Sequence, residues 1–422
     1  MSKLKDQINA ITPLMKVCFD FVKNEYNSLS SSMKKTLLFL FIMSAGFALF
    51  ALQIFIFGLG YTGLSNYVAW GVWIGGDLSL IVLGGGAFFT SFMLYILRRD
   101  EFQPIINSAI LIGLLCYAFT FIFLGLDVGQ PLRFWFAYLY PNWGEHLMPQ
   151  SMLTEVVFCI TFYFMVLVGE FTPIILGQKL LDRFPVIHQI GHYIHKLMWI
   201  GAAVGTFLSF FHQGSLGGTY GVLFAKPGWF RPHLFFLFIV SALAAGTSFT
   251  ILITWLAGKV KKKDVVPFKT YVSLARVSGF MFLIYFIFRI YDIYLMITKY
   301  VPAFDRNFWD LWGGTYGLWM LVLELIACFI PVILLNIKAF REKEKTLIIG
   351  VGSAVFGMMM NRFAATLHGF TVPNFPWKAF TPYGPTIQEI VTTLGIFSSM
   401  ALIYIFCAKY LPIFPHLDKQ EH

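Results

Sequence analysis

Two ionisable side chains inside apolar stretches are the residues of this chain that point most directly to chemistry. Asp77 lies about ten residues into one stretch, in WGVWIGGDLSLIVLGGG, and His212 closes another, in FFHQGSLGG. A charge within a membrane span costs at least ~2.5 kcal/mol, so it needs a partner, a water-filled cavity or a function. A carboxylate and an imidazole can both exchange protons. The alternative for each is a structural hydrogen bond.

Ten segments of the chain are each long and apolar enough to cross a bilayer, which takes about 20 residues. Apolar residues make up 58% of the 422 residues, and charged residues make up 12%. Because backbone groups in a bilayer must be paired within the span, we expect helices and predict an all-α integral membrane protein. The predicted spans are 36–60, 67–97, 105–126, 151–177, 196–214, 231–257, 269–296, 314–337, 346–367 and 385–408.

Lysine and arginine gather in alternate connecting segments. The cluster 261–263 and the run 341–345 are the most prominent. By the positive-inside rule, this asymmetry predicts that both termini are cytoplasmic. It also accounts for the net charge of +10, so the charge does not indicate nucleic-acid binding.

Small residues recur at corresponding places in the two halves of the chain, at 84–86 and at 244–246. Such residues let helices approach closely. The pattern favours two four-helix bundles, each followed or preceded by a flanking helix. The predicted organisation is a cytoplasmic or interfacial segment 1–35, a first flanking helix 36–66, a first bundle 67–230, a second bundle 231–384, and a last flanking helix with a cytoplasmic tail 385–422.

Two glutamates lie in the fourth predicted span. Glu155 is in its first turn, near the outer end, where a carboxylate at headgroup level is an equal alternative to a functional one. Glu170 is fifteen residues further on, in the cytoplasmic half. It could be one step of a proton path, or it could pair with Arg183 or Lys179.

Charged residues of the second half lie toward the outer side of the membrane. Arg289 and Asp292 are three residues apart, which places them on one helix face and predicts an internal salt bridge. Glu324 is near the middle of the eighth span, and Arg362 ends the ninth. Without Glu324, these residues and three of the first half suggest a polar site that opens near the periplasmic surface; its members are Asp77, Glu155, His212, Arg289, Asp292 and Arg362.

Metal and haem sites are weakly indicated. The five cysteines, at 18, 116, 159, 328 and 407, form no CxxC, so no iron–sulfur, zinc or c-type haem pattern is present. A b-type haem needs two axial histidines, for which His212 and His233 are one conceivable pair. His188, His192 and His195 have helical spacing, but in a cytoplasmic loop they indicate an amphipathic surface rather than a metal site.

The segment GLDVGQPLRFWF, residues 125–136, resembles the D-x-G-x-P-x-R-x-W element of the NrfD/polysulfide-reductase family of membrane subunits. Segments 151–171, 211–218 and 360–370 resemble the branch that contains HybB, the membrane subunit of hydrogenase-2. The resemblance covers spans 2 to 10, and Ala364 and Ala365 depart from it where more polar residues are expected. The residues that match the first element are Asp127, Gly129, Pro131, Arg133 and Trp135.

This resemblance implies a subunit of two four-helix bundles that itself binds no haem or iron–sulfur cluster. It implies a periplasmic iron–sulfur partner, joined to a periplasmic redox enzyme or a multihaem cytochrome c. Electrons would pass to or from menaquinone at a pocket in the first bundle, within the lipid of the bacterial inner membrane. Asp77 and His212 match quinone-site positions of the family, and Glu155 matches less closely.

Quinone reduction takes two electrons and two protons. Apolar and aromatic walls would hold the quinone, while Asp77 and His212 exchange protons. Tyr67, Trp70 and Trp73 are candidate walls, and an interfacial aromatic belt is the alternative for them. A possible proton path is assigned to four residues, Glu170, Arg289, Asp292 and Glu324.

Two other classes of protein remain compatible with the sequence. An ion-coupled secondary transporter also uses buried carboxylates, although the paired helix interruptions that are typical of transporters are weak here. A dihaem cytochrome b would show haem in a pyridine-haemochrome spectrum. Copurifying redox subunits would separate a respiratory subunit from a transporter.

Overall fold

The computed structural model describes residues 27, 29–139, 151–177 and 185–414, and the regular elements among them are helices. Within these residues, nine helices are long and apolar enough to cross a membrane. Helix α8, which continues from α7 through a bend of 51°, raises this number to ten. The predicted all-α membrane fold is therefore confirmed. Most of the predicted segment 1–35 lies outside the described residues.

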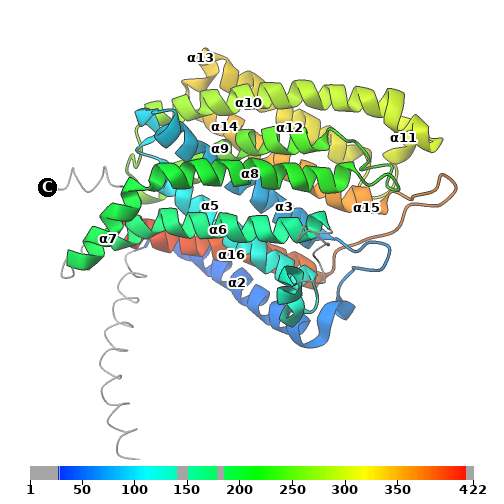
Figure 1. Ribbon diagram of the computed structural model, residues 1–422, viewed down its shortest axis with the longest axis horizontal. Coiled ribbons are helices and arrows are strands. Elements are labelled where there is room, and N and C mark those ends of the chain that lie inside the picture. The colour runs from blue at the N-terminus through cyan, green and yellow to red at the C-terminus, as the bar shows by residue number, and fades with distance from the viewer. Residues whose placement is uncertain (1–26, 28, 140–150, 178–184, 415–422) are drawn as a thin grey trace, which may run out of the picture.

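The first bundle consists of α3 with its continuation α4, α5, α6 and α8 (Figure 1). Successive helices pack against one another, and α8 closes the ring by packing against α4. The bounds are α3 Val72–Gly84, α4 Gly86–Ser91 with the π-helix Phe92–Ile96, α5 Ile106–Asp127, α6 Met152–Leu176 and α8 Met198–Gly221. The shorter elements are the 3-10 helices Asp100–Phe102 and Pro131–Tyr138, and α7 Pro185–Lys196.

The second bundle consists of α9, α10, α12 and α14, and α14 closes it by packing against α9. Its bounds are α9 Leu234–Lys261, α10 Phe268–Leu295, α12 Leu318–Asn336 and α14 Glu344–Phe363. Helix α10 continues through Met296–Tyr300 and Pro302–Phe304, and α14 through Ala364–His368 and α15 Gly369–Thr371. The short helices are α11 Phe308–Leu311 and α13 Lys338–Arg341.

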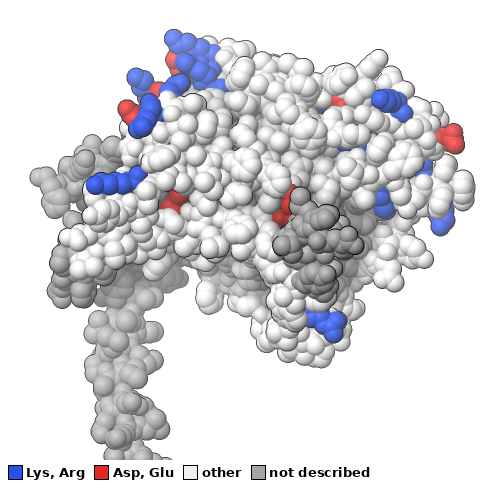
Figure 2. Space-filling model, in the orientation of Figure 1, with Lys and Arg blue, Asp and Glu red and all other residues white. Residues whose placement is uncertain are grey.

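Two flanking helices, α2 Ser31–Phe57 and α16 Ile387–Tyr410, pack together along the first bundle. Helix α16 contacts α3 and α5, whereas α2 buries only Ile54. The remaining apolar surface of α2 suits contact with lipid. Figure 2 shows that the middle of the visible face is almost free of lysine and arginine, which lie toward the two ends of the helices. This distribution is the one expected of a protein that crosses a bilayer.

Glycines hold the two bundles in close contact. A Cβ atom on Gly86 of α4 would clash with the backbone of Gly246 of α9, and a Cβ atom on Gly246 would clash with Gly86. Gly85 and Gly86 therefore face α9 across the bundle interface, and Gly86 lies against Gly246, whereas Gly84 faces Tyr117 and Cys116 of α5. This confirms the prediction that they permit close helix approach. The exact domain limits 67–230 and 231–384 stay a prediction.

Two predicted span limits are wrong in ways that affect the site. Helix α3 begins at Val72 rather than at 67, since residues 65–71 form bends and irregular chain. Helix α8 continues to Gly221 rather than ending at 214. Its glycine-rich end was predicted to be a loop, yet Gly217 fits against the first turn of α9, where a Cβ atom would lie 2.6 Å from Phe235 Cα. Glycine there serves helix packing rather than a turn.

Candidate functional site

Asp77 lies in the second turn of α3, about 8 Å from the helix start at 1.5 Å per residue. The predicted depth of about ten residues, or ~15 Å, is larger because α3 begins later than its apolar stretch. The side chain is 3% exposed, and its Oδ1 atom has no hydrogen-bond partner among the described residues. Asp127 and Tyr117 are near enough to interact electrostatically with it. Gly76 beside it accommodates Phe123, whose Cζ would lie 2.7 Å from an added Cβ.

His212 lies inside α8, nine residues before its end, and not at a helix terminus as predicted. It is therefore about 14 Å from the C-terminal end of the helix. The imidazole is fully buried, and neither ring nitrogen has a hydrogen-bond partner in the described structure. Two tyrosines flank it, with ring centroids 6.3 Å away for Tyr117 and 6.5 Å away for Tyr163.

Tyr117 lies near both predicted proton-exchanging residues. It interacts electrostatically with Asp77, its ring is near His212, and its centroid is 4.1 Å from that of Tyr163. The interior of the first bundle thus holds a carboxyl group, an imidazole and two phenols in one apolar core. All three group types can exchange protons with a bound molecule. The tyrosines were missed in the sequence, because an aromatic residue in an apolar span usually signals only packing.

The two glutamates of α6 lie at opposite ends of the bundle. Glu155, in the first turn, accepts a short hydrogen bond from Ser215 of α8. Glu170 is about 22 Å further along α6, is 2% exposed, and has no hydrogen-bond partner for either oxygen among the described residues. Its predicted alternative partners, Lys179 and Arg183, lie outside the described residues.

The three predicted quinone walls occupy different surroundings. Tyr67 is 76% exposed and precedes α3. Trp70 packs against the rings of Tyr220, Trp229 and Phe370, with centroid distances of 5.9, 6.4 and 5.4 Å. Trp73 is buried and donates from Nε1 to Thr392 Oγ1 of α16 at 2.7 Å. Trp70 is therefore the member of this set that lies at the junction of both bundles.

The family-like element 127–135 lies at the C-terminal end of α5. Asp127 is the last residue of this helix, and its Oδ1 has no partner among the described residues. Gly129 adopts φ +66°, a left-handed conformation that favours glycine, and a Cβ atom there would lie 2.6 Å from Leu59 Cγ. Pro131 begins the following 3-10 helix, where its fixed φ is favourable. The side chains of Arg133 and Trp135 are both exposed.

Helix α16 fixes the start of α3. Glu389 is completely buried and accepts from Gly63 N–H at 2.8 Å and from Tyr383 Oη at 2.7 Å. The same tyrosine oxygen accepts from Val72 N–H at 3.1 Å, at the first residue of α3. A buried carboxylate outside the bundle thus sets the entry of the helix that carries Asp77. None of these contacts was predicted from the sequence.

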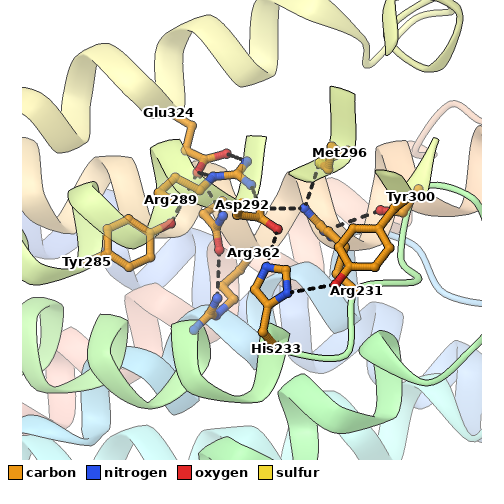
Figure 3. A network of polar contacts seen from close by, with 11 residues as sticks. Arg231, His233, Tyr285, Arg289, Asp292, Met296, Tyr300, Glu324 and Arg362 are labelled. Carbon is orange, nitrogen blue, oxygen red and sulfur yellow. Dashed lines mark hydrogen bonds and ion pairs between the residues drawn. The ribbon is translucent and has the colours of Figure 1, made fainter. Parts of the chain in front are cut away.

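A separate ionic network occupies the second bundle (Figure 3). Asp292 accepts from Arg231 Nη1 at 2.9 Å and from Arg289 Nη1 at 2.5 Å, and His233 Nε2 lies 2.8 Å from its other oxygen. Arg289 also donates to Glu324, with Nε–Oε1 at 2.8 Å and Nη2–Oε2 at 3.0 Å. The predicted Arg289–Asp292 salt bridge is confirmed. Arg231 and His233 join it from the start of α9, which the sequence did not indicate.

The residues predicted to form one outer polar site are therefore divided between two bundles. Asp77, Glu155 and His212 lie in the first, and Arg289 and Asp292 lie in the second. The four residues of the predicted proton path are divided in the same way, because Glu170 alone belongs to the first bundle. The described contacts do not connect it to the other three.

The histidines are arranged unfavourably for an axial pair. His212 and His233 lie on α8 and at the start of α9, and His233 Nε2 is already engaged by Asp292. The other deeply buried histidine of the described structure, His368, stacks on Trp312 in the second bundle at a centroid distance of 4.6 Å. These surroundings do not fit a bis-histidine haem.

Comparison with known proteins gives consistent matches over most of the chain. The sequence model described as "Polysulphide reductase, NrfD" matches residues 60–374. A menaquinone reductase integral membrane subunit from Nitratidesulfovibrio vulgaris Hildenborough is 38% identical over 369 residues, covering 85% of this chain and 86% of that protein. The probable Ni/Fe-hydrogenase 2 b-type cytochrome subunit of Escherichia coli K12 is 26% identical over 381 residues, covering 87% and 89%. An Hdr-like menaquinol oxidoreductase integral membrane subunit of Archaeoglobus fulgidus is 21% identical over 382 residues, covering 86% and 89%.

Proposed function

Since the chain belongs to the NrfD family of multi-pass membrane subunits, we propose that it is the quinone-reacting membrane subunit of a respiratory oxidoreductase complex. The observation that carries this proposal is the pair Asp77 and His212, both buried in the first bundle with unpaired polar atoms and both near Tyr117. A relative named menaquinone reductase membrane subunit supports menaquinone as the substrate class.

The proposed reaction adds two electrons and two protons to the quinone, or removes them in the reverse direction. Electrons would pass between the quinone and an iron–sulfur partner on the periplasmic side, itself attached to a redox enzyme or a multihaem cytochrome c. Asp77 and His212 would exchange the protons at the two quinone oxygens. The aromatic group around Trp70 would form the wall nearest the second bundle.

The proposal includes proton transfer across the membrane, coupled to the quinone reaction. Glu170 would take protons toward His212, because Tyr163 interacts electrostatically with Glu170 and its ring lies near His212. Neither oxygen of Glu170 has a hydrogen-bond partner among the described residues, so either could accept a proton. Measuring protons moved per electron in proteoliposomes tests this step, and we expect Glu170→Gln to lower that ratio. An unchanged ratio would remove Glu170 from the path.

The proposed location is the bacterial inner membrane, with the lysine-rich helix ends and both termini in the cytoplasm. This orientation places the start of α3, and with it Asp77, toward the periplasm. Cysteine labelling from outside the cell tests it, using Tyr67→Cys at the Asp77 end and Lys343→Cys at the opposite end. If Lys343→Cys is labelled and Tyr67→Cys is not, the protein has the opposite orientation in the membrane.

Purification in a gentle detergent tests the function as a whole. We expect mass spectrometry to identify iron–sulfur or cytochrome proteins that copurify, and solvent extraction to yield menaquinone. A protein that purifies alone, without redox partners and without quinone, would favour the ion-coupled transporter instead.

A further inference from the structure

A small cavity lined by both apolar and ionisable side chains lies in the second bundle, away from the proposed quinone site. Its volume is about 40 Å³, and ionisable side chains such as Arg231, Arg362 and His368 line it together with small residues that include Ala364 and Ala365. One water molecule needs about 10–15 Å³ by the same measure, so the cavity has room for about three waters or one monatomic ion. The two alanines that depart from the family pattern thus leave space here.

Arg362 brings a positive charge to this cavity, and no carboxylate of the described structure forms an ion pair with it. It is 1% exposed, and its guanidinium donates to Asn361 Oδ1 at 2.7 Å and to Ser241 Oγ at 2.6 Å. Its Cζ lies 3.7 Å from the ring centroid of Phe238. Among the described residues, the ion pairs of this region join other arginines to Asp292 and Glu324. Figure 3 likewise shows no dashed line from Arg362 to either carboxylate.

The charges around the cavity therefore do not balance. Three buried arginines, Arg231, Arg289 and Arg362, face two buried carboxylates, Asp292 and Glu324, which leaves one positive charge in excess. Arginine stays protonated in proteins. A buried charge without a partner costs several kcal/mol, so proteins rarely leave one uncompensated.

Hydrogen-bond donors without acceptors line the same cavity. Trp312 Nε1 and Arg231 Nε are buried and unpaired in the described structure, and both atoms can only donate. His368 is buried beside them and lines the same cavity. Glu324 is already engaged, because Oε1 accepts from Tyr285, Arg289 and Asn361 and Oε2 accepts from Arg289.

We propose that this cavity binds one small monovalent inorganic anion, such as chloride, beside Arg362, with Trp312 and Arg231 donating to it. A monatomic anion neutralises the excess charge and accepts from several donors at once. Water fills the same volume but adds no negative charge. The site goes beyond quinone chemistry, since it lies in the other bundle and needs no redox partner.

Thermal unfolding of the full-length protein, purified in a gentle detergent, tests the proposal. Sodium chloride is titrated into sodium gluconate at constant ionic strength, because gluconate is too large for a cavity of about 40 Å³. We expect a saturable rise in Tm of at least about 2 °C, since an anion that binds only the folded state stabilises it. Bromide should act in the same way.

Three variants make the test specific to the cavity. Arg362→Gln should lose the response to chloride, whereas Arg276→Gln, which removes an exposed arginine from α10, should retain it. Trp312→Phe keeps an aromatic ring stacked on His368 but removes the indole N–H donor. The chloride concentration at half of the full Tm rise, the midpoint, should therefore increase about tenfold. A wild-type Tm that does not respond, or an equal response in Arg362→Gln, would overturn the proposal. If Arg362→Gln does not fold, an unchanged midpoint in Trp312→Phe overturns it.

Discussion

Arg289 of α10 and Glu324 of α12 form a two-point ion pair, with Nε–Oε1 at 2.8 Å and Nη2–Oε2 at 3.0 Å. Both side chains are almost completely buried. The planar guanidinium matches the carboxylate geometry, so this pair fixes the relative position of the two helices as well as their charge balance.

Glu324→Gln is expected to destabilise the protein by about 3 kcal/mol, because it leaves Arg289 with one buried carboxylate instead of two. The change in Tm of the purified protein measures this loss. Glu342→Gln is the matched control, since Glu342 is half exposed and lies 3.8 Å from Lys338 in a surface pair worth at most about 1 kcal/mol. Equal stability of the two variants would contradict the buried-pair interpretation.

Gly86→Ala is expected to loosen the contact between the bundles and lower the Tm. The added methyl group meets the backbone of Gly246, which cannot move aside as a flexible side chain can. Gly352→Ala provides the control, because its Cβ would have no neighbour within 4 Å and alanine favours the helix by about 0.4–1 kcal/mol. The Tm should fall in Gly86→Ala and rise in Gly352→Ala. A Gly86→Ala protein at least as stable as wild type would refute the close approach.

Tyr383→Phe is expected to lower quinone turnover severalfold while the complex still assembles. The substitution removes the acceptor of Val72 N–H and the donor to Glu389, so the start of α3 loses its anchor. We expect the effect mainly in kcat, because Asp77 rather than the quinone walls would be displaced. Tyr61→Phe, at an exposed position, should leave turnover unchanged. If Tyr383→Phe lowers only the amount of assembled complex, and the complex that assembles has the wild-type kcat, Tyr383 has a structural role alone.

A pyridine-haemochrome spectrum of the purified chain is expected to show no b-type haem. The physical reason is that His212 and His368 lie in different bundles and His233 is engaged by Asp292. The Escherichia coli relative, in contrast, is named a probable b-type cytochrome subunit. One haem per chain would contradict this expectation and would require the histidines to rearrange.

The sequence predicted the architecture well, because membrane helices depend on hydropathy, which is read locally along the chain. It placed helix ends less well where glycine serves packing, as at Gly217, since glycine is also the residue expected in turns. The depth of His212 was wrong for this reason, and that of Asp77 because α3 begins later than its apolar stretch. Contacts between distant residues, such as Glu389 with Gly63, leave no local pattern and could not be predicted.

Quinone turnover of an Asp77→Asn complex tests the central claim most directly. Asparagine keeps the shape of the side chain but cannot exchange a proton, and general acid–base groups contribute about 10²–10⁴-fold. Asp305→Asn is the control, because Asp305 is exposed with φ 55°, a conformation that asparagine tolerates. We predict at least about 100-fold lower turnover in Asp77→Asn, with the same partner proteins present as in wild type. Full turnover in an assembled Asp77→Asn complex would contradict the assignment of this site.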